Sequence, residues 1–277
     1  MFYGQLALER LGRSISAPGA SVAGYTATPA QRAAFNNNRL VQAVRAMQQQ
    51  SNAQERTLFI RALAESLDTD TDRALAMECG RQIGRQDIGV WVARAARIKG
   101  SMFYVRDAFP TLSASVSPGL WSLAHGITRQ ESSFDPYAVS HAGARGMMQL
   151  MTGTAREQAG KMGVGYDSYR LITDPSYNVM IGSAYFQRML NMWNGSVPLA
   201  VASYNAGYGN VRKWIDRYGD PRGQVDMLKW IEAIPYVETK AYVQRVIENS
   251  VVYDSMRGPP QQAALHVSRY LGKDRPA

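Results

Sequence analysis

Apolar residues recur along most of this chain with the three- and four-residue spacing of an α-helix, and this period restricts the fold more than any other feature. The clearest example follows Asp174-Pro175, where an N-cap and a proline at the first helical position begin a predicted helix over 175–193. No alternating polar and apolar run extends beyond a few residues, so strands are not expected. The sequence therefore predicts an all-α protein.

The predicted helices fall into two groups of different composition. The first group begins with a helix over 1–12 and a connection rich in Ser, Ala, Pro, Gly and Thr, and continues with helices near 39–50, 53–67, 72–84 and 88–99. Most tyrosines and glycines lie in the second group, whose predicted helices cover 118–132, 152–160, 175–193, 197–205, 225–232 and 239–253. We therefore expect a helical linker region over 1–103, a second domain over 104–257 and a C-terminal tail over 258–277.

Composition excludes some classes of protein and leaves others open. A chain of 277 residues with 45% hydrophobic residues and five tryptophans is long and apolar enough for a packed core, which excludes disorder. Its net charge of +9 favours polyanionic partners, which include nucleic acid, an anionic membrane face and a carboxylate-bearing cell-wall polymer. Because basic and aromatic residues are not interleaved along one element, and no recognition motif is present, a nucleic-acid partner is not expected.

The chain shows no pattern typical of a membrane span or an exported precursor. There is no run of 18 apolar residues, and Glu9 and Arg10 interrupt the segment where a signal peptide would be continuously apolar. Cys79 is the only cysteine, which excludes an intrachain disulfide, and its helical setting indicates a buried small hydrophobic residue. We therefore expect a soluble chain without a visible signal peptide or transmembrane segment.

Three motifs that could bind a cofactor or a metal fail on spacing. The acidic turn 68–72 would need a glycine and a bidentate glutamate at the positions of Arg73 and Cys79 to bind calcium, so its residues are expected to be alternate N-caps of the next helix. The 207–209 glycine pair follows a predicted helix and lacks the remaining residues of a phosphate loop. The three histidines, His125, His141 and His266, share no ligand spacing and are expected at the surface or as caps. The sequence implies no metal and no cofactor.

A carboxylate ends the apolar face of the predicted helix 118–132, which is expected to begin with Ser117 as its N-cap. Leu120, Ala124, Ile127 and Glu131 follow one another at spacings of four, three and four residues and share one face. Burial on that face and the negative end of the helix dipole would both raise the pKa of Glu131, as a general acid requires. In the alternative, the side chain bends out to solvent from a fraying last turn.

Three later segments offer polar groups that suit a carbohydrate. Residues 140–151 combine glycines, methionines and an amide, although an ordinary turn before a core helix would also explain them. Residues 202–209 resemble a helix end that presents the Tyr204 hydroxyl and the Asn205 amide outward. In the last segment, Glu238 would cap the final helix and Tyr242 would follow one turn later, and a purely structural role remains open for both.

Taken in order, four motifs make the chain resemble the soluble lytic murein transglycosylases, a lysozyme-like family that cleaves bacterial peptidoglycan. They are Glu131-Ser132, GMMQLM at 146–151, YNAG at 204–207 and ETKAYV at 238–243. The resemblance implies a lysozyme-like domain after a linker region and the remnant of an α-helical superhelix. Thr152, Met147 and Lys240 depart from the commoner family residues at peripheral or packing positions.

The resemblance also assigns roles and a partner. Glu131 would be the sole catalytic acid and base, and the expected partner is the glycan strand of peptidoglycan in the periplasm or cell envelope. By motif position, the substrate-binding groove would contain Ser140, Gln149, Met151, Tyr204, Asn205, Glu238 and Tyr242.

The nearest candidate for a second carboxylate is Asp135, which precedes Pro136 and is expected to cap a turn. With a single acid, the acetamido group of the substrate would assist and a 1,6-anhydro product would form. A hydrolytic muramidase and a non-catalytic peptidoglycan-binding protein are the alternatives.

Overall fold

The structure, a computed structural model, describes residues 1–47, 53–257 and 266–273 and is all-α within these ranges. Extended pairing there is limited to isolated bridges of single residues. Two 3₁₀ helices, η1 (Val22–Gly24) and η2 (Arg106–Ala108), lie in the connections. The α-helices are α1 (Phe2–Arg10), α2 (Pro29–Asn36), α3 (Arg39–Ala46), α4 (Ala53–Ser66), α5 (Asp70–Gln82), α6 (Asp87–Ile98), α7 (Trp121–Glu131), α8 (Thr152–Met162), α9 (Arg170–Thr173), α10 (Pro175–Met192), α11 (Val197–Ala206), α12 (Tyr208–Tyr218), α13 (Met227–Ala233), α14 (Val237–Ser255) and α15 (Val267–Tyr270).

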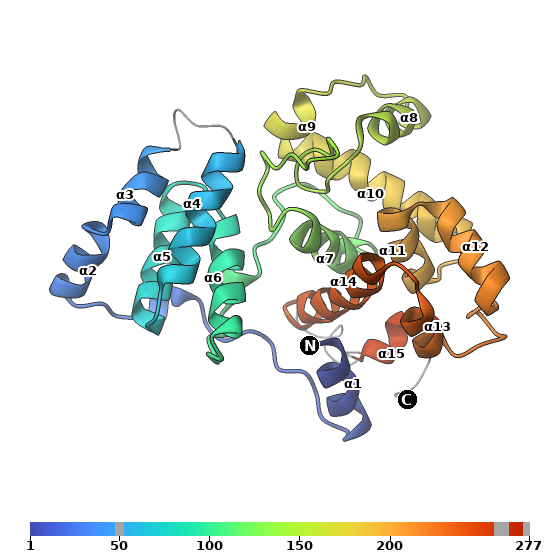
Figure 1. The fold of residues 1–277 in the computed structure, drawn as a ribbon, viewed down its shortest axis with the longest axis horizontal. Helices are drawn as coiled ribbons and strands as arrows, with labels where there is room; N and C mark the ends of the chain where they lie inside the picture. Colours follow the sequence, from blue (N-terminus) through green and yellow to red (C-terminus); the bar gives the residue numbers. More distant parts are fainter. Residues whose placement is uncertain (48–52, 258–265, 274–277) are drawn as a thin grey trace.

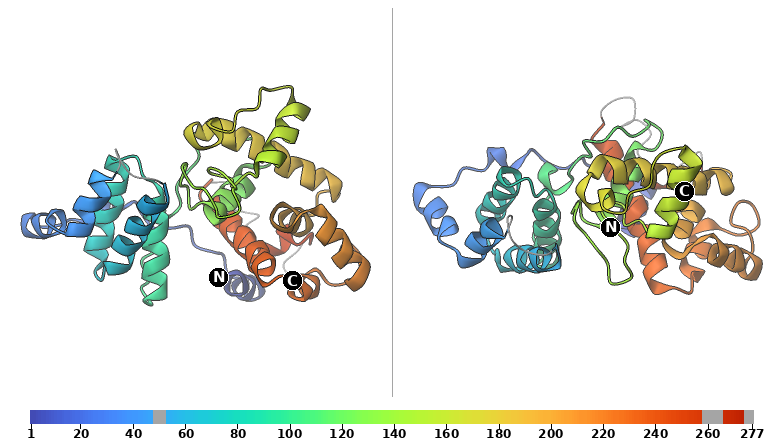
Figure 2. Two further views of the ribbon diagram at one scale, coloured as in Figure 1. Left: turned by 45° about the horizontal axis from the view of Figure 1, so that its top comes forward. Right: turned by 90° about the horizontal axis from the view of Figure 1, so that it is seen from above.

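The helices form two groups in space. Helices α2–α6 lie together on one side of the molecule. On the other side, α8–α13 and α15 lie around α7 and α14 (Figure 1). Both views in Figure 2 keep the two groups apart. Helix α1 packs against α14 and α15, so the chain begins beside the second group before it crosses to the first. The predicted domain boundary at residue 103 stays a prediction. Helices α2–α6 are the part of the predicted linker region that forms the first group.

Local capping explains several helix starts. Asp174 accepts a hydrogen bond from the Tyr177 amide at 3.0 Å, which confirms the predicted start of α10. In the acidic turn, the capping residue of α5 is Thr69, whose hydroxyl accepts from the Asp72 amide, and Asp70 and Asp72 lie in the first turn of the helix. The prediction that Ser117 caps α7 is wrong. Residues 117–120 form a turn in which the Leu120 amide donates to the Ser117 carbonyl, and the helix begins at Trp121.

The sequence patterns missed α2, α9, α12 and α15. Helix α12 was missed because the glycines at 207 and 209 indicated a turn; Gly207, at φ +84°, ends α11 and is at once the N-cap of α12. Part of the tail predicted for 258–277 is the short helix α15. Residues 48–50 of the predicted helix 39–50 lie outside the described residues, and α3 ends at Ala46.

Helices α7 and α14 pack against each other along the centre of the second group. Ala124 and Ile127 of α7 are buried, as their spacing predicted. The two helices approach each other closely at Gly126, where an added Cβ atom would lie 2.5 Å from the Ser250 hydroxyl and 2.9 Å from the Val246 carbonyl oxygen. A residue without a side chain therefore allows α14 to lie against α7, and it sets how close the polar groups farther along the two helices can come.

A buried polar network joins the two groups of helices. Arg85 forms ion pairs with Asp87 at 2.8 Å and with Asp135 at 3.3 Å, and all three side chains are almost fully buried. Asp135 also accepts from the Thr57 hydroxyl of α4 and, with its other oxygen, from the Tyr137 amide. The second contact confirms that Asp135 caps a turn, and the first shows that it also fixes the loop after α7 to the linker region.

Candidate functional site

Glu131 is the last residue of α7 and receives a hydrogen bond from α14. The Tyr242 hydroxyl donates to Glu131 Oε1 at 2.6 Å, and Tyr242 itself is 4% exposed. Glu131 lies five residues after the Gly126 crossing and Tyr242 four residues before Val246. The two side chains therefore meet because α7 and α14 run past each other in opposite directions from that crossing.

The protein environment changes the acidity of Glu131. Burial raises its pKa from 4.5 to about 7, and the negative charge of Glu238 acts in the same direction, while the hydrogen bond from Tyr242 opposes them. The direction and its main cause agree with what the apolar face of the helix predicted. A carboxyl group with a pKa near 7 can both donate and accept a proton close to neutral pH.

Tyr204 approaches the same carboxylate from α11. Its hydroxyl donates to the Met148 carbonyl oxygen at 2.8 Å, so it points into the protein, and the prediction that it faces outward is wrong. Burial raises the pKa of Tyr204 well above 10, and the charge of Glu131 raises it further. Tyr204 therefore remains a protonated donor and holds the 146–151 segment next to Glu131.

The side chain of Asn205 is also turned inward. Its Oδ1 atom accepts a hydrogen bond from the Thr239 hydroxyl at 2.6 Å, and Thr239 is 2% exposed. The Asn205 amide was predicted to face outward, and for its oxygen this prediction is wrong. The contact ties the end of α11 to the first turn of α14, which keeps both helices in register around Glu131. Thr239 stands inside the fourth motif, but nothing in the local pattern indicated this partner.

The segment 140–151 forms a tight loop whose own polar groups support it. Ser140 Oγ accepts from the Ala144 amide at 3.0 Å, and Gln149 Nε2 donates to the carbonyl oxygens of Ala138 and Gly146. An added Cβ atom at Gly146 (φ +74°) would lie 2.0 Å from the Leu171 carbonyl oxygen. The glycine is therefore needed at this point of the loop.

The loop is fixed to the end of α7 by the residue that follows Glu131. Ser132 Oγ donates to the Met147 carbonyl oxygen at 2.7 Å and accepts from the Phe134 amide at 3.1 Å. Ser133 and Phe134 then adopt left-handed backbone conformations, with φ of 59° and 70°. Three elements thus converge at Glu131: the end of α7, the 140–151 loop and the first turns of α14.

The predicted site residues differ in how they relate to Glu131. Glu131, Tyr204, Glu238 and Tyr242 act on one another through hydrogen bonds or charge. Met151 (46% exposed) and Glu238 are exposed, and Ser140 is partly exposed. In the part of the chain that the structure describes, no hydrogen bond joins Ser140 or Met151 to Glu131. Their groove roles stay predictions, as do those of Gln149 and Asn205.

Among the described residues, no second carboxylate forms a hydrogen bond with Glu131. Asp135 shares Arg85 with Asp87 and is 2% exposed, so it belongs to the network between the helix groups. Glu238 affects the pKa of Glu131 but lies on the exposed face of the first turn of α14. The geometry therefore gives one buried acid with a tyrosine donor.

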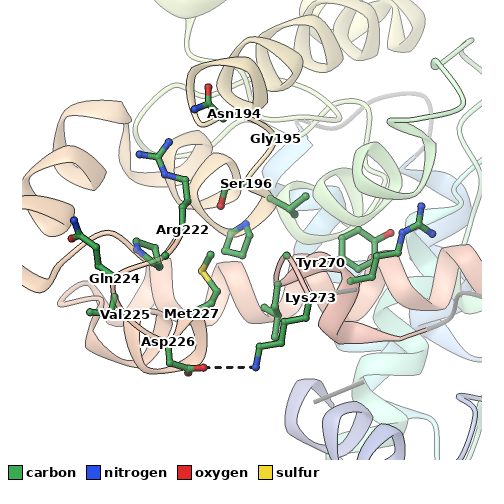
Figure 3. A pocket seen from close by; sticks show the side chains of 17 residues that line it. Asn194, Gly195, Ser196, Arg222, Gln224, Val225, Asp226, Met227, Tyr270 and Lys273 are labelled. Atoms are coloured by element: carbon green, nitrogen blue, oxygen red, sulfur yellow. Dashed lines mark ion pairs between the residues drawn. The ribbon is translucent and has the colours of Figure 1, made fainter. Parts of the chain in front are cut away.

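A cavity of about 800 Å³ lies elsewhere, and none of the predicted site residues lines it (Figure 3). Its walls come from residues 194–198, 221–227 and 269–273, and Asp226 and Lys273 form an ion pair across its rim at 3.7 Å. The one acid among its lining residues is Asp226, which is paired with Lys273 and whose pKa is lowered mainly by a backbone hydrogen bond, so the cavity offers no acid comparable with Glu131. The candidate active site is therefore the surface around Glu131.

The histidines take different positions from one another. The prediction that His125 is a surface or capping residue is wrong, because it is fully buried, stacks 4.0 Å from Trp121 and accepts from the Leu112 amide. Burial lowers its pKa to about 4. His266 caps α15, as expected, and His141 is exposed.

Among the described residues, no three His, Cys, Asp or Glu side chains form a group that could hold a metal ion. In those residues, likewise, no helix has the length and apolar character to cross a membrane.

Known proteins are similar to the part of the chain that contains Glu131. Residues 114–226 match the family model described as Transglycosylase SLT domain. The chain is 36% identical over 138 residues to the soluble lytic murein transglycosylase of Escherichia coli K12, and this match covers 50% of the chain and 21% of the relative. A second relative, the membrane-bound lytic murein transglycosylase C of Cronobacter sakazakii, is 37% identical over 101 residues, which are 32% of the chain and 28% of the relative.

Solved structures resemble the fold over nearly the whole chain. The 70 kDa soluble lytic transglycosylase from Escherichia coli superposes with a TM-score of 0.70 at 24% identity, covering 94% of this chain and 42% of that protein. An inactive mutant of the lytic transglycosylase Slt from Pseudomonas aeruginosa gives a TM-score of 0.71 at 26% identity, covering 92% and 41%. The chain therefore spans about a fifth of the first curated relative and about two fifths of these solved chains.

Proposed function

We propose that this chain, which carries a transglycosylase SLT domain over residues 114–226, is a lytic transglycosylase that cleaves the glycan strands of bacterial peptidoglycan at the MurNAc-β-1,4-GlcNAc bond. The observation that carries the proposal is the environment of Glu131: a largely enclosed carboxyl whose pKa burial raises to about 7, held by Tyr242, with no second carboxylate bonded to it among the described residues. Such an acid suits proton donation to a leaving sugar oxygen at neutral pH.

Similar proteins support the assignment of Glu131. One solved structure with this fold is a complex of the 70 kDa soluble lytic transglycosylase with bulgecin A. The Pseudomonas aeruginosa protein is described as inactive after a glutamate is changed to glutamine. Loss of activity from so small a change is the behaviour expected of a protein that depends on one glutamic acid, as we propose for Glu131.

In the proposed mechanism, Glu131 acts twice. Protonated Glu131 donates its proton to the glycosidic oxygen, and that oxygen leaves with the electrons of its bond to C1. The acetamido carbonyl oxygen of the same MurNAc ring bonds to C1 and forms an oxazolinium ion, the role that a second carboxylate plays in ordinary retaining glycosidases. Ionised Glu131 then accepts the proton of the C6 hydroxyl, whose oxygen displaces the acetamido oxygen at C1. The products are a 1,6-anhydroMurNAc end and a regenerated acid.

Other residues would bind the substrate or hold the acid. Tyr242 orients Glu131, while Tyr204 and Asn205 fix the surrounding walls through Met148 and Thr239. Ser140, Gln149, Met151 and Glu238 would line the groove, and no cofactor takes part. The proposed location is the cell envelope, where peptidoglycan is found.

Mass spectrometry of the fragments released from purified peptidoglycan tests the reaction. We expect fragments that end in 1,6-anhydroMurNAc, without the addition of water. Reducing-end fragments would instead identify a hydrolytic muramidase. Fragments of neither kind, with peptidoglycan still retained in a pull-down, would indicate a non-catalytic binding protein.

Replacing Tyr242 with phenylalanine tests how the acid is tuned. The hydrogen bond from this hydroxyl lowers the pKa of Glu131, so its loss should raise that pKa above about 7. Because the first step needs protonated Glu131, activity should fall as pH rises through this pKa, and the fall should move to higher pH in Tyr242→Phe. Loss of positioning should also lower kcat about tenfold.

Tyr253→Phe is the matched control, because Tyr253 lies on the same helix but donates to the Pro110 carbonyl oxygen. Its pH–rate profile should match that of the wild type. An unshifted profile in Tyr242→Phe would show that this hydrogen bond does not set the acidity of the catalytic group.

A further inference from the structure

Asn178 of α10 is a fully buried amide whose three hydrogen bonds join the 140–151 loop to α9 and α10 (Figure 1). Its Oδ1 atom accepts from the Met148 amide at 2.8 Å. Its Nδ2 atom donates to the Arg145 carbonyl oxygen at 2.9 Å and to the Leu171 carbonyl oxygen at 3.0 Å. Because two carbonyl oxygens need the NH2 group as their donor, the orientation of this amide is fixed.

Two glycines allow α10 and the loop to lie close together at this amide. An added Cβ atom at Gly146 would lie 2.4 Å from Asn178 Nδ2. An added Cβ atom at Gly182, about one turn farther along α10, would lie 2.6 Å from Met148 Sδ and 2.9 Å from Met148 Cβ. Met148 itself is fully buried. The loop is therefore packed tightly against α10 both at the amide and one turn beyond it.

The segment that Asn178 holds is also the segment that lies next to Glu131. The Met147 carbonyl oxygen accepts from Ser132 Oγ at 2.7 Å, and Ser132 directly follows Glu131. The next carbonyl oxygen along the loop accepts from the Tyr204 hydroxyl, whose pKa the charge of Glu131 raises. Helix α10 thus holds the loop from one side, and residues beside the acid hold it from the other.

The side chain that follows Met148 depends on the same contacts. Gln149 has a left-handed backbone, with φ of 48°, which a residue other than glycine rarely adopts unless its surroundings hold it. Its Nε2 atom donates to the carbonyl oxygens of Ala138 and Gly146. Within the described residues its Oε1 atom accepts no hydrogen bond, so this oxygen is available to a substrate donor. The direction of that oxygen depends on the backbone that Asn178 fixes.

We propose that Asn178 is a positioning residue, which fixes the 145–149 segment as one wall of the substrate groove and so sets the affinity for the glycan strand. This inference rests on the proposed function and adds to it a residue outside the four sequence motifs. Asn178 is fully buried, so it acts through the loop and does not touch the substrate. Because Tyr242 holds Glu131 from α14, a displaced loop should weaken substrate binding more than proton transfer.

Asn178→Asp tests this role because it changes one group and keeps the shape of the side chain. One carboxyl oxygen can still accept from the Met148 amide, while the other would face the Arg145 and Leu171 carbonyl oxygens without a proton to donate. At pH 8 the KM for a GlcNAc–MurNAc tetrasaccharide should be about tenfold above that of the wild type, with kcat within about threefold.

Low pH should partly rescue Asn178→Asp, which a general loss of packing would not show. Burial raises the pKa of the introduced carboxyl, and once protonated it can donate to one of the two carbonyl oxygens. The ratio of variant KM to wild-type KM should therefore fall from about tenfold at pH 8 to about threefold at pH 5. Taking the ratio at each pH removes the titration of Glu131, which both proteins share. Arg170 and Asp174, the charged pair nearby in sequence, are bonded to each other in both proteins.

Asn191→Asp is the matched control for a carboxyl introduced into α10. Asn191 is exposed and accepts from Gln187 on the same helix, so its variant should keep the wild-type KM at both pH values. Gly182→Ala displaces the loop without touching Asn178, because the added methyl group would meet Met148. It should also raise KM, and it decides the question if Asn178→Asp does not fold.

The possible results separate the positioning role from the proposed function. Wild-type KM values in folded Asn178→Asp and Gly182→Ala, or a KM ratio that is equal at pH 5 and pH 8, would overturn the role of Asn178 and leave the proposed function intact. If the wild type did not cleave the tetrasaccharide, the proposed function would fail. Calorimetric affinities of the wild type and Asn178→Asp for the same tetrasaccharide would then decide the positioning role, and equal affinities would exclude it.

Discussion

Glu131→Gln is expected to lower kcat for peptidoglycan cleavage by about 10³-fold or more, with substrate binding retained. Glutamine keeps the size of the side chain and can still accept the hydrogen bond from Tyr242, but it can neither donate the proton to the leaving oxygen nor accept one from the C6 hydroxyl. Because the Glu131 carboxyl acts in both proton transfers, a neighbouring side chain would have to replace it in both. The release of 1,6-anhydroMurNAc ends, followed by mass spectrometry, measures the loss.

The stability of Glu131→Gln shows whether its loss of kcat comes from missing proton transfer or from a disturbed fold. The folded-state pKa of Glu131 is raised from 4.5 to about 7, so between these values the folded protein binds the proton more tightly than the unfolded chain does. The contribution of this group to stability is therefore fully present below pH 4.5 and is lost as pH rises through about 7. Glutamine stays neutral, so Glu131→Gln should be more stable than the wild type above pH 7, by about 1–3 kcal/mol. Urea unfolding at pH 5 and pH 8 measures this difference.

Glu238→Gln provides the matched control for charge. Glu238 is exposed and raises the pKa of Glu131 through its negative charge, so its neutralisation should move the alkaline fall of activity slightly downward and leave the maximum rate within about threefold. Full turnover by Glu131→Gln would end the assignment of Glu131 as the acid. Equal losses of activity in Glu131→Gln and Glu238→Gln would show that the loss comes from the changed charge of the groove and not from missing proton transfer by Glu131.

The parts of this site that sequence predicted are those set by local periodicity. The helical spacing from Ala124 to Glu131 fixed the face of α7, and burial on that face gave the direction of the pKa change. A cap followed by proline predicted the start of α10, because both signals act within one turn. Glycine was ambiguous, since Gly207 ends one helix and begins another where the pattern indicated a turn.

The unpredicted parts depend on partners far apart in the chain. Asp135 pairs with Arg85, which is fifty residues earlier in the sequence, and this contact appears only when the two groups of helices pack together. The inward direction of Tyr204 depends on the position of the Met148 carbonyl, and that of Asn205 on Thr239. His125 was misplaced for the same reason, because only the tertiary packing shows that Trp121 and the Leu112 amide enclose it.

Gly126→Ala is expected to lower the free energy of unfolding by about 2–3 kcal/mol and the melting temperature by about 5–10 °C. The added methyl group would lie 2.5 Å from the Ser250 hydroxyl and 2.9 Å from the Val246 carbonyl oxygen. These two atoms are hydrogen-bonded to each other at 2.8 Å inside α14, so neither can move away without breaking that bond. The two helices must separate, and thermal unfolding followed by circular dichroism measures the cost.

Gly160→Ala separates packing at the crossing from the general effect of alanine in a helix. Gly160 lies in α8, is exposed, and has no atom within 4 Å of an added Cβ, so alanine there should be neutral or stabilising by about 0.5–1 kcal/mol. Separation of α7 from α14 should also lengthen the bond between Tyr242 and Glu131 and lower kcat in Gly126→Ala. Destabilisation of Gly126→Ala without any loss of kcat would show that the crossing supports the fold but does not position the acid. Equal stability of Gly126→Ala and Gly160→Ala would mean that α7 and α14 are not held at the distance that Gly126 permits.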